Sequence, residues 1–302
     1  MSILAVNGLA KRYGPIQALK HVSFEVPEGA VFGILGPNGS GKTTLLGVLM
    51  DVLKPDSGEF SFFDTGDATS NRKKIGTLLE TPNFYHYLSA VDNLKIQAEI
   101  KEKDPSDIER VLEMVNLLDR KHSKFSTFSL GMKQRLAIAG CLLGDPQVLV
   151  FDEPTNGLDP EGIAETRELI LRLHQQGKTI IMASHLLDEV EKVCTHVAIL
   201  QKGTLLAVGP VDEILVNEDV VEVSSVNLPA IEKLVREQKP SIISKQYNNH
   251  LDLHFPQGSA NAEELNQFFF EHGIILNHLR LKRKSLEARF FELTQANNTA
   301  KN

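Results

Sequence analysis

Residues 36–43, which read GPNGSGKT, limit the fold of this chain more than any other segment. They follow a short apolar run at residues 31–35 and precede apolar residues that recur at helical spacing between positions 45 and 53. Closely spaced glycines let backbone N–H groups turn inward around an anion, and the N-terminus of the next helix adds a partial positive charge. The order strand, loop, helix predicts a phosphate-binding loop in an α/β domain, with an ordinary glycine-rich turn as the structural alternative.

The side chains at the end of this segment suit a nucleotide bound with a metal ion. Lys42 would place its ammonium beside the β- and γ-phosphates, and the Thr43 hydroxyl would ligate Mg²⁺. Thr44 would add one more donor, and backbone N–H groups would supply the other contacts. The nucleotide-binding residues predicted here are Gly36, Pro37, Asn38, Gly39, Ser40, Gly41, Lys42, Thr43 and Thr44.

A second segment places two carboxylates directly after a buried strand. Residues 148–151 are all apolar, and Asp152 and Glu153 follow them. Such a strand end would bring Asp152 beside the phosphate loop, where it would hold Mg²⁺ through water. Glu153 would then face the γ-phosphate as the general base for an attacking water. Taken alone, the pattern also fits a strand that simply leaves the core.

The rest of the chain predicts two domains. A helical pattern at residues 161–176 lies between apolar runs at 148–151 and 179–183, which indicates parallel strands with helical crossovers. From residue 219 the pattern changes to β-α-β-β-α-β, which predicts a small α+β, ferredoxin-like unit. We therefore expect an α/β domain over residues 1–215 and an accessory domain over residues 219–295.

Composition excludes several classes of protein. The 302 residues carry a net charge of −7 without a dominant basic tract, so nucleic acid is not an expected partner. No apolar run reaches the roughly 18 residues of a membrane helix, so a role at a membrane would require docking onto another protein. The two cysteines, Cys141 and Cys194, lie in apolar runs and are expected to be buried, reduced thiols.

A third segment, residues 128–135 (FSLGMKQR), brings in a family resemblance. It resembles the signature motif of ABC ATPases, usually written LSGGQ. Ser129 and Gly131 match the motif, whereas Leu130 and Met132 depart from the commonest residues. In the family this segment closes over the γ-phosphate bound by the opposite subunit. Without that resemblance, Ser-x-Gly before a helix is a plain N-cap.

Three other residues match family landmarks in the expected order. Tyr13 resembles the aromatic residue that stacks on adenine. Asp159 resembles the short loop that contacts the other subunit and its nucleotide. His185, which follows an apolar strand, resembles the switch histidine that bridges the γ-phosphate and the catalytic glutamate. The resemblance thus implies Glu153 and His185 as the catalytic residues.

Glu80 is a departure from the family pattern. The family usually carries a glutamine here that touches Mg²⁺ and the attacking water. A carboxylate would still ligate Mg²⁺ but adds negative charge near the phosphates. Some ABC exporter ATPases similar to those that handle peptide antibiotics carry Glu at this place, so Glu80 is either an active variant ligand or a sign of slow turnover. The predicted metal ligands are Thr43, Glu80 and Asp152.

Together these landmarks imply a P-loop ABC ATPase domain with a mixed-sheet core and a helical signature subdomain. The implied protein is an ATP- and Mg²⁺-binding ATPase subunit of an ABC transporter, at the cytoplasmic face of the membrane. Its expected partners are a second ATPase subunit, identical or related, and an integral membrane permease, with export favoured over import. The alternatives are a soluble ABC-class ATPase not coupled to transport and a non-hydrolysing nucleotide sensor. The aromatic-rich segment 81–88 would either receive the permease, as the resemblance implies, or pack its aromatic side chains into the helical subdomain.

Overall fold

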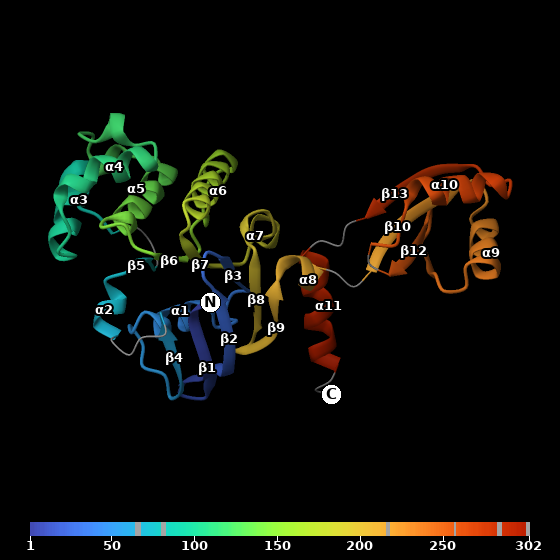
Figure 1. Cartoon of the computed structure of the whole chain (residues 1–302), viewed down its shortest axis with the longest axis horizontal. Coiled ribbons are helices and arrows are strands. Elements are labelled where there is room, and N and C mark those ends of the chain that lie inside the picture. Colours follow the sequence, from blue (N-terminus) through green and yellow to red (C-terminus); the bar gives the residue numbers. More distant parts are fainter. Residues whose placement is uncertain (64–67, 80–82, 216–217, 257, 283–285, 300–302) are drawn as a thin grey trace. The chain divides into compact units, whose positions relative to one another are not determined.

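A six-stranded mixed sheet organises the N-terminal part of the computed structural model, which describes residues 1–63, 68–79, 83–215, 218–256, 258–282 and 286–299 (Figure 1). Its strand order is β5-β6-β7-β3-β8-β9, and every neighbouring pair is parallel except β8 and β9. The chain divides into two units, Met1–Val211 and Asp212–Asn302. The strands of this sheet are β3 (Val31–Leu35), β5 (Ile75–Leu78), β6 (Val148–Asp152), β7 (Thr179–Ser184), β8 (His196–Gln201) and β9 (Thr204–Pro210).

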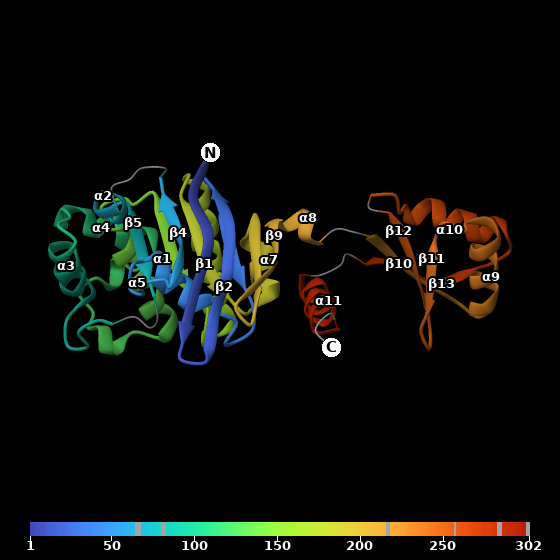
Figure 2. The same ribbon diagram turned by 90° about the horizontal axis from the view of Figure 1, so that it is seen from below.

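A second, antiparallel sheet of three strands packs against the first and encloses α1 (Figure 2). It contains β1 (Ser2–Tyr13), β2 (Ile16–Pro27) and β4 (Ser57–Phe62), in the order β2-β1-β4. Val22, Phe24 and Val26 alternate with exposed residues on β2 and point into the core, as the period-2 pattern predicts. Leu45 and Leu46 of α1 (Lys42–Leu49) fill the same core from the helix. Helix α1 thus lies between the two sheets, with the phosphate loop at its N-terminus.

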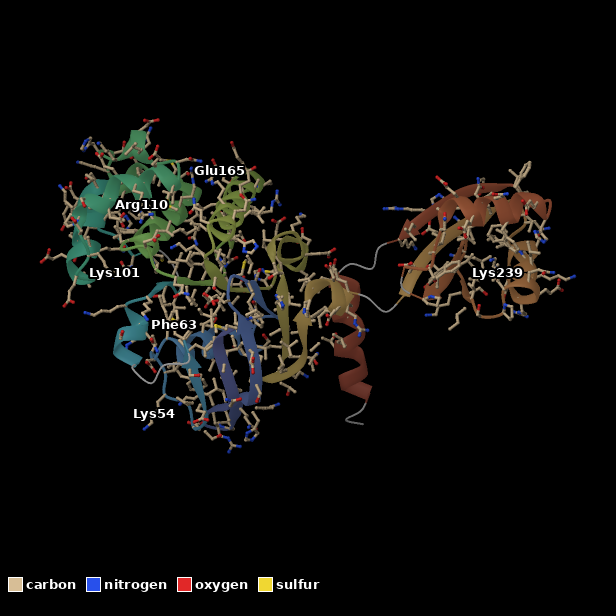
Figure 3. The ribbon with its side chains drawn as sticks, in the orientation of Figure 1. Lys54, Phe63, Lys101, Arg110, Glu165 and Lys239 are labelled. Carbon is tan, nitrogen blue, oxygen red and sulfur yellow. The ribbon has the colours of Figure 1, made fainter. Side chains whose placement is uncertain are left out.

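The helices of the first unit include a group formed by α3, α4 and α5, which contact one another (Figures 1 and 3). Ser129 caps α5 and Asp159 caps α6, each through its side chain. Short 3₁₀ turns connect several of these elements. The helices are α2 (Ala68–Arg72), α3 (Ala90–Ile100), α4 (Ile108–Met114), α5 (Leu130–Leu142), α6 (Pro160–Gln175) and α7 (Leu187–Val193), and α8 (Val211–Leu215) begins at the last residue of the unit.

Two helices end earlier than their apolar spacing predicts. The helix after the phosphate loop stops at Leu49, and Asp51 adopts a left-handed backbone with φ 57°, so Val52 is 68% exposed. In the second case the apolar residues at 108, 111, 112, 115 and 118 recur at helical spacing, but α4 ends at Met114 and Asn116 has φ 54°. A left-handed residue just after a helix reverses the chain and shifts the phase of the following side chains. Apolar spacing continued past such a residue therefore no longer describes one face of a helix.

The second unit follows the expected order β-α-β-β-α-β. Its sheet is antiparallel throughout, in the order β11-β12-β10-β13. Val221, Val223, Leu251 and Leu253 point from the sheet towards apolar side chains of α9 and α10. A further helix, α11, follows. The elements are β10 (Glu218–Ser225), α9 (Leu228–Gln238), β11 (Ile243–Gln246), β12 (Leu251–Pro256), α10 (Ala262–Glu271), β13 (Leu276–Lys282) and α11 (Leu286–Thr299).

Among the helices in the described ranges, none is both long enough and apolar enough to cross a bilayer.

The cysteines are expected to resist thiol reagents in the folded protein. Both are buried, and burial raises the pKa of the Cys141 thiol to about 11 and that of Cys194 further. Since the thiolate is the reactive form, neither residue should react with a chromogenic disulfide reagent at pH 8, whereas two thiols per chain should react in denaturant. Rapid labelling of either cysteine in the native protein would contradict their burial.

Candidate nucleotide site

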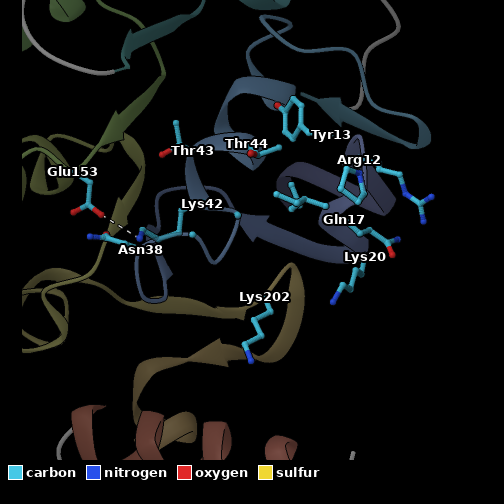
Figure 4. Close-up of a pocket in the computed structure, with 15 residues that line it drawn as sticks. Arg12, Tyr13, Gln17, Lys20, Asn38, Lys42, Thr43, Thr44, Glu153 and Lys202 are labelled. Atoms are coloured by element: carbon cyan, nitrogen blue, oxygen red, sulfur yellow. Dashed lines mark ion pairs between the residues drawn. The ribbon is translucent and has the colours of Figure 1, made fainter.

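A cavity of about 760 Å³ opens in the first unit beside the phosphate loop (Figure 4). The cavity is lined by the β1–β2 hairpin, by the phosphate loop with the start of α1, and by Lys202 of the β8–β9 turn. Its lining residues are Arg12, Tyr13, Pro15, Ile16, Gln17, Ala18, Lys20, Asn38, Gly39, Gly41, Lys42, Thr43, Thr44, Glu153 and Lys202.

Gly41 of the loop is required by a close backbone contact. Gly41 has φ 110°, and a Cβ atom there would lie 2.5 Å from the carbonyl oxygen of Ala18 on β2. From the other side, Gly203 in the β8–β9 turn donates its N–H to the carbonyl of Ser40 at 2.9 Å. A side chain at position 41 would therefore push the loop off β2. These contacts fix the loop in front of α1, with its backbone exposed to the cavity.

Lys42 lies across the loop. Its ammonium donates to the carbonyl of Gly36 at 2.8 Å and lies 3.3 Å from Oε1 of Glu153. The side chain is only 6% exposed. The charge is thus held between the loop and the end of β6, at the position that the sequence predicts for a phosphate-binding cation.

Glu153 and His185 form a hydrogen-bonded pair at the ends of neighbouring parallel strands. Oε2 of Glu153 lies 2.8 Å from Nδ1 of His185 and accepts the backbone N–H of the same residue at 3.3 Å. The backbone N–H of Glu153 donates to Ala183 on β7. Glu153 also has a left-handed φ of 49°, a costly conformation that is common at functional sites. The carboxylate therefore bridges an imidazole and the Lys42 ammonium, where it can accept a proton from a bound water.

Oxygen ligands for a magnesium ion are present at the same edge. Asp152 ends β6 and is buried, and Thr43 lines the cavity at the start of α1. The hydroxyl of Ser40 is also buried and has no hydrogen-bond partner among the described residues. Carboxylate and hydroxyl oxygens are the donors that Mg²⁺ prefers, so this set fits the ion. The third predicted ligand, Glu80, lies outside the described residues.

The structure gathers part of the predicted set around the cavity and leaves part away from it. Tyr13 is 44% exposed and lies at the cavity edge, beside the loop residues. Gly36, Pro37 and Ser40 belong to the same loop but are not among the described residues that line the cavity. Ser129, Gly131 and Asp159 are absent from the cavity lining that the structure describes: Ser129 accepts the N–H of Met132 at 3.2 Å and Asp159 that of Gly162 at 3.0 Å. In this chain both side chains therefore act as helix N-caps.

Sequence reasoning did not identify several cations of the cavity. Arg12, Lys20 and Lys202 line it together with Lys42, and Glu153 is the only carboxylate among the described residues of that lining. A cavity with this charge favours a polyanion. Arg12 precedes Tyr13 in the sequence, so the prediction that Tyr13 stacks on adenine was a signal that could have identified Arg12 as a cavity residue. The sequence predicted only a hairpin turn at Lys202. It could not place that turn beside the phosphate loop, because the contact joins segments far apart in the chain.

Replacing Lys202 with methionine is expected to weaken ATP binding about threefold, the effect of an exposed charge pair. The apparent affinity should also fall less steeply with added salt. Titration calorimetry at two salt concentrations would measure both effects. Lys54→Met, at an exposed position outside the cavity, is the control, and equal effects of the two substitutions would refute the contribution of Lys202.

Comparison of the sequence with known proteins identifies a matching family and similar relatives. The family model described as ABC transporter matches residues 19–156. The uncharacterized ABC transporter ATP-binding protein YhcH of Bacillus subtilis is 37% identical over 298 residues, which cover 97% of this chain and 96% of that protein. The bacitracin transport ATP-binding protein BcrA of Bacillus licheniformis is 34% identical and covers 97% of both chains.

A solved structure extends the match to three dimensions. The dimeric ATP-binding cassette MJ0796, in a post-hydrolysis state bound to ADP and Pi, superposes with a TM-score of 0.60 at 26% identity. The match covers 68% of this chain and 98% of that structure. The chain belongs to the ABC transporter ATP-binding proteins, and it is an ATP-binding ATPase subunit of that family.

Proposed function

We propose that this chain powers export through a separate membrane permease, from the cytoplasmic face of the membrane. The observation that carries this proposal is the likeness to the bacitracin transport protein over nearly the whole of both chains, the second unit included. A likeness confined to the ATPase domain would not favour export over import. The substrate path would lie in the permease.

At the site, the loop N–H groups and Lys42 would bind the phosphates, and Tyr13 would stack on adenine. Thr43, Asp152 and Glu80 would hold Mg²⁺, which neutralises charge on the β- and γ-phosphates when it is bound. The four cations among the described residues of the cavity lining support this arrangement, because ATP is a polyanion.

Glu153 would act as the general base. Its carboxylate is fixed by two hydrogen bonds to His185, so one oxygen is oriented while the other faces Lys42. His185 would hold this geometry and the γ-phosphate, while Glu153 takes the proton of the attacking water. Most of the rate enhancement would come from positioning and electrostatics, as in other phosphoryl transfers.

A second ATPase subunit would complete the site. Ser129 is exposed at the start of α5, and Asp159 is exposed at the start of α6. Like Gly131, they lie away from the cavity of their own chain. In a head-to-tail dimer they would contact the nucleotide bound by the second subunit. The dimeric state of the cassette that superposes on this chain supports the proposal. The accessory domain, residues 219–295, would serve as a regulatory or dimer-stabilising domain.

The aromatic segment divides between the two interpretations. Phe84 is buried, with its ring 5.2 Å from that of Phe125, so it packs into the helical group. Tyr85 and Tyr87 are 52% and 69% exposed and lie 6.0 Å apart, ring to ring. Exposed aromatics are enriched at protein interfaces. We therefore assign Tyr85 and Tyr87 to the surface that receives the permease.

Glu80→Gln is expected to retain hydrolysis within about tenfold, a barrier change of roughly 1.4 kcal/mol. The amide oxygen would still ligate Mg²⁺, and the site would lose one negative charge. A steady-state phosphate-release assay would measure the rate. A loss of several orders of magnitude would contradict the assignment of Glu80 as a metal ligand that glutamine can replace.

The transport proposal is tested by co-purification. Tagged chain carrying Glu153→Gln would be extracted from native membranes in mild detergent with Mg-ATP, and the bound proteins would be identified. A polytopic membrane protein at about one-to-one with the ATPase subunits supports a separate permease. Recovery of ribosomes or DNA-associated proteins, with hydrolysis intact in the unmodified chain, would favour a soluble ABC-class ATPase.

A further inference from the structure

Three helices of the first unit begin at, or two residues after, a residue proposed to act on ATP. Ser129 is the N-cap of α5, Asp159 is the N-cap of α6, and His185 lies two residues before the start of α7. The orientation of each helix therefore bears on the position of one of these side chains.

Helix α6 is joined to both of the other helices by ion pairs. On one side, Glu165 lies on α6 with its Oε2 3.4 Å from Nη2 of Arg135 on α5 (Figure 3). On the other side, Nη1 of Arg167 donates to Oε1 and Oε2 of Glu189 on α7, at 3.1 and 2.8 Å. The side chain of Glu189 is 13% exposed and that of Arg167 is 29% exposed, so this second pair is partly shielded from water.

Helix α7 is short and has no side-chain cap at its N-terminus. It spans seven residues, and its N-cap, Leu186, offers no side-chain hydrogen bond. Its apolar face is anchored by Val190, which is fully buried and packs over Gly33 of β3. Apolar contacts hold the helix against the sheet but are not directional, whereas the charge-assisted hydrogen bonds from Arg167 to Glu189 are directional.

The position of α7 bears directly on the Glu153–His185 pair. His185 lies between the end of β7 and the start of α7, and it holds the Glu153 carboxylate through both its ring and its backbone N–H. A small rotation of α7 would move both donors together. A misplacement of about 1 Å in a reacting group can cost a hundredfold in rate.

From this geometry we propose that Arg167 and Glu189 are positioning residues, which orient His185 and thereby the Glu153 carboxylate for hydrolysis. The inference rests on the proposed roles of Glu153 and His185. Neither Arg167 nor Glu189 lines the nucleotide cavity in the part of the chain that the structure describes. Their loss should therefore affect the rate of the bound complex and leave its formation unchanged.

The test uses the full chain with Arg167→Met and, as the near-isosteric change, Glu189→Gln. Each is expected to lower kcat about tenfold, within the range that misplacement of a reacting group allows, with the Kd for ATP unchanged within twofold. The exchanged pair, Arg167→Glu with Glu189→Arg, should recover part of the lost kcat, because the ion pair can re-form. Lys192→Met is the matched control, since Lys192 contacts Glu189 at 2.8 Å from the same helix without joining α7 to α6.

The outcomes separate this inference from the proposed function. If His185→Ala abolishes hydrolysis while Arg167→Met and Glu189→Gln keep the wild-type kcat, the positioning role is wrong and the site stands. If His185→Ala keeps the wild-type kcat, the proposed site itself fails. A loss of kcat accompanied by an equal loss of ATP affinity, or equalled by Lys192→Met, would assign the pair to general stability and overturn the inference.

Discussion

Replacing Glu153 with glutamine is expected to lower kcat for ATP hydrolysis about a thousandfold, within the range measured for loss of a general base. The amide oxygen can still accept the N–H of His185, so the local geometry should persist while the proton acceptor is lost. ATP binding should remain, because the loop and Lys42 are unchanged. Phosphate release would be measured alongside titration calorimetry with ATP.

The same variant should accumulate as a dimer in Mg-ATP, visible by size-exclusion chromatography with light scattering, because the closed state no longer turns over. Glu161→Gln, at an exposed position in the first turn of α6, is the control and should behave as wild type. A normal hydrolysis rate in Glu153→Gln would show that another group is the base.

Replacing Lys42 with alanine is expected to weaken ATP binding by about tenfold to a hundredfold, the value of one charge-assisted hydrogen bond of 1.5–3 kcal/mol. The change removes the cation that lies between the loop carbonyls and Glu153 and leaves that carboxylate facing the phosphates without a neutralising neighbour. Titration calorimetry with ATP and ADP would measure the loss.

Lys54→Ala is a control for the removal of a lysine side chain, since Lys54 is exposed outside the cavity. An unchanged affinity in Lys42→Ala, with the protein folded by circular dichroism, would contradict the phosphate-binding role of residues 36–43.

The sequence could predict the parts of the fold that local pattern determines. The strands at residues 31–35, 148–151 and 179–183 were expected from apolar runs, and each lies in the central sheet. Helix ends were predicted less well, because Asp51 and Asn116 adopt left-handed conformations that apolar spacing does not reveal. Glycine or proline at these positions would have indicated a helix end clearly, whereas aspartate and asparagine indicate it only weakly.

The same distinction applies to the site. Glu153 follows a strand whose neighbour ends at Ser184, so the ends of two parallel strands bring Glu153 and His185 together. Lys202 and the Arg167–Glu189 pair carried no such signal, because each depends on the packing of elements far apart in the chain. The sequence also predicts Ser129 as a helix N-cap, and in the structure its side chain accepts the backbone N–H of Met132 at the start of α5.

The central claim, that each ATP site is shared between two subunits, is tested most directly by mixing two inactive variants. Glu153→Gln removes the base, and Ser129→Arg blocks the signature segment. A mixed dimer of the two would retain one site with both wild-type parts. With the hydrolysis rate of the wild-type chain as reference, random mixing should restore about a quarter of it, because about half the dimers are mixed and each has one working site. A rate no higher than that of the separate variants would place Ser129 and Glu153 in the same site of one chain and contradict the account.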